Sequence, residues 1–178
     1  MNEDLIKARV EHIEDSNLKH LVTVCLDRLP SYFWMKPSSS TGKYHPSDEH
    51  IPGGLSLHTA RVVDVVELLC ETQILKVSKD EAIAACLLHD VARYGFDIKA
   101  TPHTLREHPM LGEEFLRQTW AADSWGVDEV VMQRIAHAIG SHMGRWHTSS
   151  PESPLDQIVH LADMIAAGYV PVKGAVLK

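Results

Sequence analysis

The sequence predicts an all-α protein built as one compact helical bundle. Apolar residues recur at helical spacing in several segments, residues that favour helix ends flank those segments, and no strand pattern of any length competes. The chain has 178 residues, enough to bury one core but too few for two ordinary domains. We therefore expect a single domain over residues 1–178, with helices and a long loop over 1–50, a core over 51–168 and a tail over 169–178.

The first third of the chain predicts two helices and a long loop. Residues 2–14 are expected to form a short polar helix. Ser16 is a suitable N-cap for a second helix over residues 17–29, which Pro30 would end. Residues 31–54 are rich in proline, glycine and serine, as is typical of a loop, and loops of this length often act as lids or binding loops. The loop side chains that could reach over a pocket are Trp34, Lys36, Lys43, Tyr44, His45 and His50.

Two predicted helices follow this loop. Residues 55–76 carry leucine and valine on one side and predict a long, largely buried helix. The run Ser78-Lys79-Asp80-Glu81 has the capping-box pattern and opens a second helix that ends at residues 89–90. Residues 91–106 show no regular pattern and are expected to be irregular.

The last three predicted helices also have recognisable ends. Pro109 suits the first turn of a helix that runs to about residue 120. Residues 128–142 predict the next helix, which a polar loop over residues 148–153 follows. Ser153-Pro154 opens the final helix, which stops near Gly168.

The overall charge limits the partners that we expect. The chain has 24 Asp and Glu residues against 17 Lys and Arg residues, a formal charge of −7 at pH 7. Proteins that coat nucleic acid are normally basic, so this charge argues against that class. A small anionic substrate is compatible with it, because a metal and a few arginines can make one pocket locally positive. A small nucleotide-like molecule and a short single-stranded nucleic acid are both candidate partners, and a homo-oligomer stays open.

The cysteines and the hydropathy pattern indicate a compartment. The three cysteines, at positions 25, 70 and 86, lie in apolar helical stretches without close pairs. Such thiols are expected to be small buried hydrophobes, which fits a reducing cytosol. The acidic N-terminus lacks the basic and apolar parts of a signal peptide, and no apolar run approaches membrane-spanning length. We therefore expect a cytoplasmic protein without a membrane partner.

A His-Asp doublet is the most informative chemical feature of the chain. His89 and Asp90 end the apolar run over residues 82–88, and buried imidazoles and carboxylates are costly unless they are hydrogen-bonded, paired or bound to a metal. Imidazole and carboxylate ligands from separate helices suit one divalent ion or two, with Mn, Fe, Co, Ni, Mg and Zn all candidates. The residues that could complete such a site are His58, His108, His142 and Asp163.

This ordered set resembles the HD-domain metal-dependent phosphohydrolases, which are named after the doublet. The resemblance runs from about residue 51 to residue 167 and extends to local phrases. Gly-Gly-Leu-Ser-Leu-His-Thr (53–59) resembles the first-ligand helix of HD 3′→5′ exoribonucleases, and His-Pro-Met-Leu-Gly (108–112) is similar to the HD-GYP phosphodiesterases. Leu-Leu-His-Asp-Val-Ala-Arg (87–93) resembles the usual Leu-Leu-His-Asp-Ile-Gly-Lys. The resemblance implies a helical HD domain whose metal-binding core spans residues 51–168.

The residues and the resemblance together suggest a role for each ligand. His58, His89, Asp90 and Asp163 are expected to hold a first metal, and the resemblance implies that His108 and His142 complete a second site. In similar families the carboxylate of the doublet bridges two metals or touches the water bound to them, so Asp90 is also a catalytic candidate. A metal lowers the pKa of that water towards neutrality. His160, one turn before Asp163, could orient that ligand or be a core histidine.

His137 is a rival of His142 as a ligand. The two lie five residues apart on one predicted helix, roughly 140° around its axis, so they are not expected to face one ion together. The resemblance favours His142, which falls within Ser141-His142-Met143-Gly144. HD-GYP proteins have two adjacent histidines there, and Met143 takes the place of the second, which argues against a third metal.

Several cations are candidates for binding phosphate. Arg93 follows Asp90 by three residues, where the family often has lysine, and its planar guanidinium suits phosphate oxygens. We predict that it is catalytic and substrate-binding, with a solvated surface arginine as the alternative. Trp34, Tyr44 and Trp146 could stack on a base or pack locally. Further candidates for the phosphate are Arg61, Lys43, Arg106 and Arg145.

These features predict a metal-dependent phosphohydrolase that cleaves a phosphate ester or anhydride of a nucleotide or short oligonucleotide with a metal-activated water. A compact acidic chain favours a free nucleotide, whereas the phrases around His58 and His142 look more like exoribonucleases, which usually add an oligonucleotide-binding barrel. The main alternative is an HD-type mixed-valence di-iron oxygenase acting on a small phosphonate or polyol, because such proteins share the ligand order. A nucleotide sensor without activity is less favoured, since its usual mark is the loss of ligands.

Overall fold

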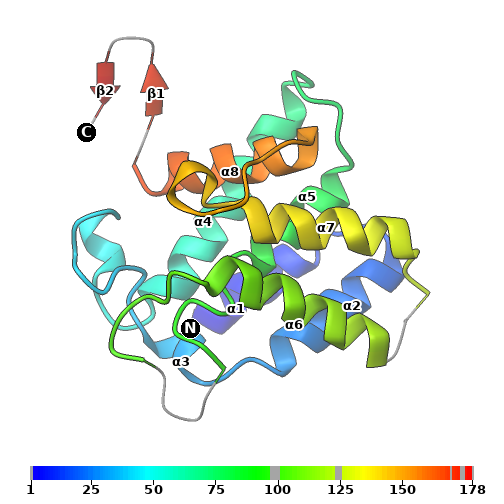
Figure 1. The fold of residues 1–178 in the computed structure, drawn as a ribbon, viewed down its shortest axis with the longest axis horizontal. Coiled ribbons are helices and arrows are strands. Elements are labelled where there is room, and N and C mark those ends of the chain that lie inside the picture. The colour runs from blue at the N-terminus through cyan, green and yellow to red at the C-terminus, as the bar shows by residue number, and fades with distance from the viewer. Residues whose placement is uncertain (1, 97–100, 123–125, 169, 173–174, 178) are drawn as a thin grey trace.

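The computed structural model describes residues 2–96, 101–122, 126–168, 170–172 and 175–177. It confirms the all-α class, because helices pack directly on helices around a common core (Figure 1). The helical elements are α1 (Asn2–Val10), α2 (Ser16–Asp27), α3 (Tyr32–Met35), η1 (Ser47–Glu49), α4 (Gly54–Glu71), α5 (Lys79–Leu88), α6 (His108–Ala122), α7 (Glu129–Ser141), η2 (Gly144–Trp146) and α8 (Pro154–Ala166), and the strands are β1 (Val170–Val172) and β2 (Ala175–Leu177).

Side-chain caps begin four of the long helices. Ser78 accepts a hydrogen bond from the backbone N–H of Glu81 at the start of α5, which is one half of the predicted capping box, while the carboxylate of Glu81 accepts from Arg134 instead. Ser153 opens α8 with a complete capping box that includes Asp156. Asp128 caps α7 by accepting a hydrogen bond from the backbone N–H of Val130. The prediction for α2 was wrong by one residue, because Asp15 is the N-cap and accepts from the N–H of Leu18.

Other expectations need correction. The loop over residues 31–54 contains two short helical elements, α3 and η1. The helix predicted over residues 55–76 ends at Glu71, because Gln73 adopts the left-handed backbone conformation that terminates a helix. The predicted tail contains the unpredicted antiparallel hairpin of β1 and β2, with Val170 opposite Leu177. Strands of three residues are too short to leave a period-two pattern in a sequence.

The burial of the cysteines and the length of the helices can be compared with what the sequence predicted. All three cysteines are free thiols, with Cys25 and Cys86 buried and Cys70 only half-buried. None of the helices in the described ranges is both long enough and apolar enough to span a membrane.

The helix α5 lies in the middle of the bundle. Every residue from Ala82 to Leu88 is buried, and the helix contacts α2, α4, α7 and α8. Small side chains such as Ala84 and Ala85 allow these neighbours to approach closely. Because the helix is enclosed along this length, the residues at its C-terminal end, His89 and Asp90, are also fully buried. The fold therefore places two polar side chains where water does not reach them.

A close backbone contact holds the segment before α4 in place. Gly53 has a φ of +85°, in the left-handed region that favours glycine. A Cβ atom added at Gly54 would lie 1.8 Å from the carbonyl oxygen of Glu49, so no side chain fits there. The same carbonyl accepts hydrogen bonds from the backbone N–H and the Oγ–H of Ser38, at 3.0 and 3.1 Å. The element η1 is thereby fixed against the first turn of α4.

Replacement of Gly54 by alanine should destabilise the protein. The new methyl group would collide with backbone rather than with a movable side chain, so we expect the free energy of unfolding to fall by about 3 kcal/mol. Gly140→Ala is the matched control, because the nearest atom to its Cβ would be a carboxylate oxygen of Glu113, at the end of a side chain that can change rotamer, and not backbone. Urea unfolding of the two variants measures the difference. Equal stability of both would show that the Gly54 contact is not rigid.

Candidate metal centre

The six predicted ligands converge on one buried region. His58 lies on α4, His89 and Asp90 at the end of α5, and the others come from α6, α7 and α8. Five of the six are at most 1% exposed, and only the side chain of Asp163 reaches 13%. Five of the predicted ligands form two linked groups whose ligand atoms lie within 4.8 Å of one another, namely His58, His89 and Asp90, and Asp90, His108 and His142.

The first group surrounds one oxygen of Asp163. This Oδ1 atom lies 3.0 Å from Nε2 of His58 and 3.9 Å from Nε2 of His89. The same nitrogen of His89 is 3.5 Å from Oδ2 of Asp90. His89 thus lies between the two carboxylates, and His58 shares Asp163 with it. Imidazole nitrogens and carboxylate oxygens are donors suited to a divalent cation.

The second group surrounds the other oxygen of Asp90. Its Oδ1 atom is 3.0 Å from Nε2 of His108 and 3.6 Å from Nε2 of His142, while these two nitrogens are 3.3 Å apart. Two neutral imidazoles that meet through their lone pairs repel each other unless a proton or a metal lies between them. The two oxygens of Asp90 face different groups, Oδ1 towards His108 and His142 and Oδ2 towards His89 and Arg93, so this carboxylate could serve both groups.

Backbone carbonyls orient three of the imidazole rings. Nδ1 of His89 donates to the carbonyl of Cys86 at 2.7 Å, and the corresponding bonds of His108 and His142 measure 2.6 and 2.7 Å. A carbonyl can only accept, so each ring carries its proton on Nδ1 and turns the lone pair of Nε2 inward. Nε2 of His89 and Oδ1 of Asp90 are buried without a well-aligned hydrogen bond among the described residues, as expected of atoms that bind a metal.

The charges in this region favour metal binding. Burial opposes the ionisation of Asp90, but Arg93 and His89 hold the pKa of its carboxyl well below the usual range. Burial lowers the pKa of His89 to about 4, so this ring is neutral and ready to act as a ligand. Burial also opposes the ionisation of Asp163, yet a hydrogen bond from His58 keeps its pKa low. The residues present thus fit a divalent cation.

Arg93 lies between the doublet and the long loop. One Nη group donates to Asp90, and the other donates to Nε2 of His45 at 3.1 Å. The turn that carries Arg93 is anchored by Tyr32, whose hydroxyl donates to the carbonyl of Val91 at 2.9 Å, and by Tyr94, whose hydroxyl donates to the carbonyl of Pro37. The side chain of Arg93 is 12% exposed, so it is not a solvated surface arginine.

The structure places the other predicted cations elsewhere. Arg61 pairs with Asp48 and Glu49 beside His58 and does not line the pocket described below. Arg145 stacks on the ring of Trp146, with its guanidinium carbon 4.6 Å from the ring centroid. Lys43 and Arg106 are exposed and likewise absent from the pocket lining. Among the predicted cations, only Arg93 lies at the junction of pocket and candidate centre.

The structure also places the remaining candidate histidines. His142 joins the centre, whereas His137 is 48% exposed at its side chain and donates from Nδ1 to Asp156 at 2.9 Å. His160 does not bond Asp163 in any described contact. Its Nδ1 lies 2.5 Å from the carbonyl oxygen of His142 and so supports the backbone of that residue.

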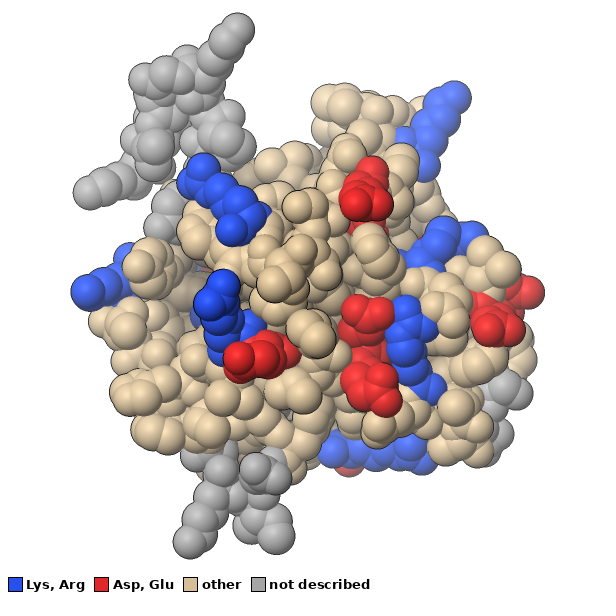
Figure 2. All heavy atoms as spheres, in the orientation of Figure 1, with Lys and Arg blue, Asp and Glu red and all other residues tan. Residues whose placement is uncertain are grey.

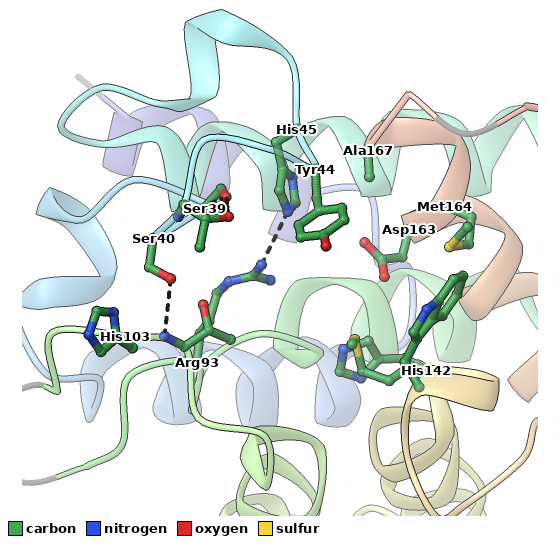
Figure 3. A pocket seen from close by; sticks show the side chains of 14 residues that line it. Ser39, Ser40, Tyr44, His45, Arg93, His103, His142, Asp163, Met164 and Ala167 are labelled. Atoms are coloured by element: carbon green, nitrogen blue, oxygen red, sulfur yellow. Dashed lines mark hydrogen bonds between the residues drawn. The ribbon is translucent and has the colours of Figure 1, made fainter. Parts of the chain in front are cut away.

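A pocket opens beside the candidate centre. It has a volume of about 530 Å³, and its lining includes Arg93, His142 and Asp163 (Figure 3). The loop contributes residues 39–41, Tyr44 and His45 to one wall. Of the loop side chains expected to reach over a pocket, Tyr44 and His45 do so, whereas Lys36, Lys43 and His50 are not in the lining. Trp34 instead packs against the core. The polar lining includes Ser39, Ser40, Thr41, His103 and Thr104, and the apolar lining includes Tyr44, Met143, Trp146, Met164 and Ala167.

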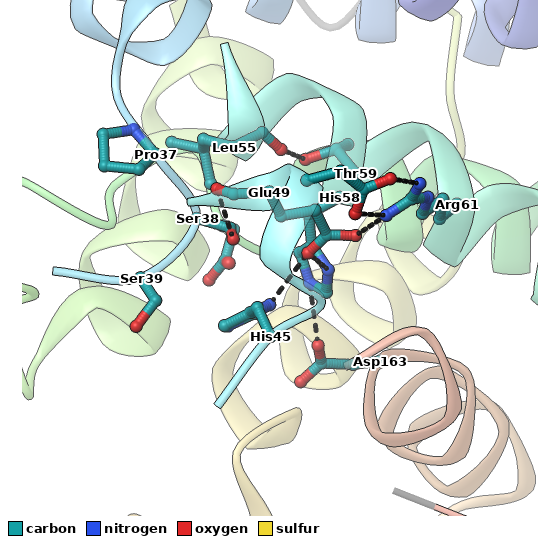
Figure 4. A network of polar contacts seen from close by, with 12 residues as sticks. Pro37, Ser38, Ser39, His45, Glu49, Leu55, His58, Thr59, Arg61 and Asp163 are labelled. Carbon is teal, nitrogen blue, oxygen red and sulfur yellow. Dashed lines mark hydrogen bonds and ion pairs between the residues drawn. The ribbon is translucent and has the colours of Figure 1, made fainter. Parts of the chain in front are cut away.

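No sequence pattern predicted the part played by Glu49. Its carboxylate is completely buried and contacts His45, His58 and Arg61 (Figure 4). The residue belongs to a short acidic run, Ser47-Asp48-Glu49, which in a sequence is typical of a solvated loop. The spacing of four between His45 and Glu49 was the only local signal, and it is too common to identify a site.

Comparison with known proteins identifies a family. A family model described as the HD domain matches residues 55–168, which is more than half of the chain. This range contains all six predicted ligands. Searches of curated proteins and of solved structures found no match.

Metal binding should release a proton from His58. Burial alone would lower the pKa of this ring, but the carboxylates of Asp163 and Glu49 raise it to about 9, so the metal-free ring is protonated at pH 7. A protonated Nε2 cannot bind a metal, and the metal affinity should therefore fall as the pH falls below 9. Calorimetric titration with Mn²⁺ at pH 7, in buffers of different ionisation enthalpy, should show the release of about one proton for each ion that binds at the position beside His58. Uptake without proton release would contradict this role.

Proposed function

The chain belongs to the HD-domain family of metal-dependent phosphohydrolases, and from this we propose that it hydrolyses a phosphate ester or anhydride of a free nucleotide. One observation carries the proposal. The shared carboxylate of Asp90, with imidazoles on both sides, is linked through Arg93 to a pocket that one small molecule could fill.

The proposed ligands divide between two positions. His58, His89 and Asp163 would hold one divalent ion, His108 and His142 would hold the other, and Asp90 would serve both. Such ions act as Lewis acids on a phosphate oxygen and lower the pKa of a water molecule. The protein contributes the fixed orientation of the Nε2 atoms and a site from which bulk water is largely excluded.

Arg93 is proposed to neutralise charge on the substrate phosphate. Its Nη groups are held by Asp90 and His45, which leaves the guanidinium little freedom to move. Its buried Nε–H has no partner among the described residues and is therefore a free donor. A guanidinium that is oriented before the substrate arrives stabilises developing charge without reorganisation.

The dimensions of the pocket favour a free nucleotide over an oligonucleotide. A volume of about 530 Å³ lies within the range of small-molecule sites. Its apolar lining, which includes Tyr44 and Trp146, suits the face of a base. On the face drawn in Figure 2, Lys and Arg residues lie scattered among Asp, Glu and uncharged residues and form no continuous basic track. An extended nucleic acid would be expected to need such a track.

A di-iron oxygenase is the second candidate, because a carboxylate shared between two ligand groups is also a dinuclear iron arrangement. The apolar wall of the pocket suits a phosphonate or polyol less well than a base. Metal analysis and an oxygen electrode separate the two functions, since hydrolysis of a nucleotide consumes no oxygen.

Loss of either member of the doublet should abolish hydrolysis. His89→Ala and Asp90→Asn remove ligand atoms from the centre, and we expect kcat/KM to fall by more than about 100-fold, beyond the loss usual for residues outside the ligand set. A nucleotide panel assayed with Mn²⁺, Co²⁺, Mg²⁺ or Fe²⁺ provides the measurement, and His137→Ala provides the control. Full activity in either doublet variant would refute the assignment.

Loss of the aromatic wall should weaken nucleotide binding more than catalysis. Stacking of a base on an aromatic ring contributes about 1–3 kcal/mol, so Trp146→Ala or Tyr44→Ala should raise KM for a nucleotide by about tenfold, with a smaller change in kcat. Ribose 5-phosphate, which lacks a base, should show the same KM with each variant as with the wild-type protein. An unchanged KM for nucleotides would mean that the base does not contact this wall.

A further inference from the structure

The burial of Glu49 requires an explanation. This residue lies in the loop segment before α4, yet it has 0% exposure. Removing a carboxylate from water is costly unless other groups replace its hydration. The polar and charged groups that take the place of water around this carboxylate indicate its role.

Three side chains surround the carboxylate (Figure 4). The Oε2 atom is 3.1 Å from Nδ1 of His45 and 3.3 Å from Nδ1 of His58. The Oε1 atom accepts a hydrogen bond from Arg61 at 2.7 Å. Each oxygen thus faces a potential N–H donor, and one of these donors belongs to a proposed metal ligand.

The contact with His45 has a defined direction. Arg93 donates to Nε2 of His45, and a guanidinium has no acceptor, so Nε2 must be the unprotonated nitrogen. His45 is therefore neutral and donates from Nδ1 to Glu49. The chain of contacts from Asp90 through Arg93 and His45 ends at this carboxylate.

The contact with His58 differs from the arrangement of the other ligand histidines. His89 and His142 are helix C-caps and His108 opens α6, so each can donate from Nδ1 to a carbonyl that lies three residues earlier. His58 lies inside α4, where carbonyls are already engaged in the hydrogen bonds of the helix. Its Nδ1 is buried and makes no well-aligned hydrogen bond among the described residues. An acceptor for it must come from another element.

We propose that Glu49 is a positioning residue for the metal centre. Its carboxylate accepts a hydrogen bond from Nδ1–H of His58 and so holds Nε2 of that ring towards the first metal position. The inference rests on the proposed metal-dependent function. The contact of 3.3 Å is long for a hydrogen bond, and such contacts often tighten when a site is occupied. The backbone of Glu49 is already fixed, because its carbonyl is held by Ser38 and pressed against Gly54.

A third metal position at His45, Glu49 and His58 is the rival explanation, since their ligand atoms lie within 4.8 Å of one another. Two cations oppose it. Arg61 lies 2.7 Å from the carboxylate, and Arg93 occupies the outer nitrogen of His45. Two guanidinium groups this close to the ligand atoms repel a further cation, so N–H donors explain the cluster better.

Mn²⁺ affinity tests the proposal. Glu49→Leu removes the acceptor and should weaken Mn²⁺ binding to the full chain by about 10–100-fold in calorimetric titration. Glu49→Gln keeps an oxygen that can accept from His58 and should restore most of the affinity. Asp48→Asn is the matched control, because Asp48 shares Arg61 with Glu49 but does not touch His58, and it should bind Mn²⁺ as the wild-type protein does.

Thermal unfolding without metal separates folding from positioning. If Glu49→Leu does not fold, Glu49→Asp takes its place. The shorter side chain keeps a negative charge for Arg61 but is one methylene group too short to reach His58 as Glu49 does. Weaker Mn²⁺ binding is again expected. Wild-type affinity in the folded Leu or Asp variant would overturn this inference alone, provided that His89→Ala still abolishes binding. Absence of Mn²⁺ binding by the wild-type protein would overturn the proposed function as well.

Discussion

The structure depends on an ionised carboxylate held in the core. Desolvation opposes the charge of Asp90, and the imidazoles on both sides together with the guanidinium of Arg93 offset that cost. The enclosed helix α5 delivers this carboxylate to the middle of the bundle, and the neighbouring helices supply the groups that it needs. Packing and chemistry are therefore linked, because the same close approach of helices that buries the apolar face of α5 brings the six ligand side chains together.

Helix ends are the means by which this site is built. A carbonyl near the last turn of a helix has no partner within that helix, so it can orient an imidazole at no cost to the helical hydrogen bonds. His89 and His142 use this property at the ends of α5 and α7. His58, inside α4, has no such carbonyl, and the carboxylate of Glu49 lies beside it instead. The rigid helices and the loop over residues 38–54 thus contribute different parts of one centre.

The electrostatics of the pocket differ from those of the whole chain. A formal charge of −7 would repel an anion from most of the surface, yet Arg93 lines the pocket and contacts Asp90 of the candidate centre. The wall formed by the loop is partly polar and partly aromatic, which matches a molecule with a charged end and an apolar face. A positive charge confined to the pocket allows the chain to select a small anionic ligand without a basic surface.

The sequence by itself determined the helical class and most helix ends, and it singled out the six residues that we propose as ligands. Helical periodicity and capping residues are local properties, and the spacing of the histidines and aspartates follows the pattern of a family. The hydrogen bond of His137 to Asp156, the pairing of Arg61 and the burial of Glu49 depended on the tertiary structure. Each of these is set by which elements pack together, and a loop carboxylate such as Glu49 acquires its partners only when η1 meets the first turn of α4 through the contact with Gly54.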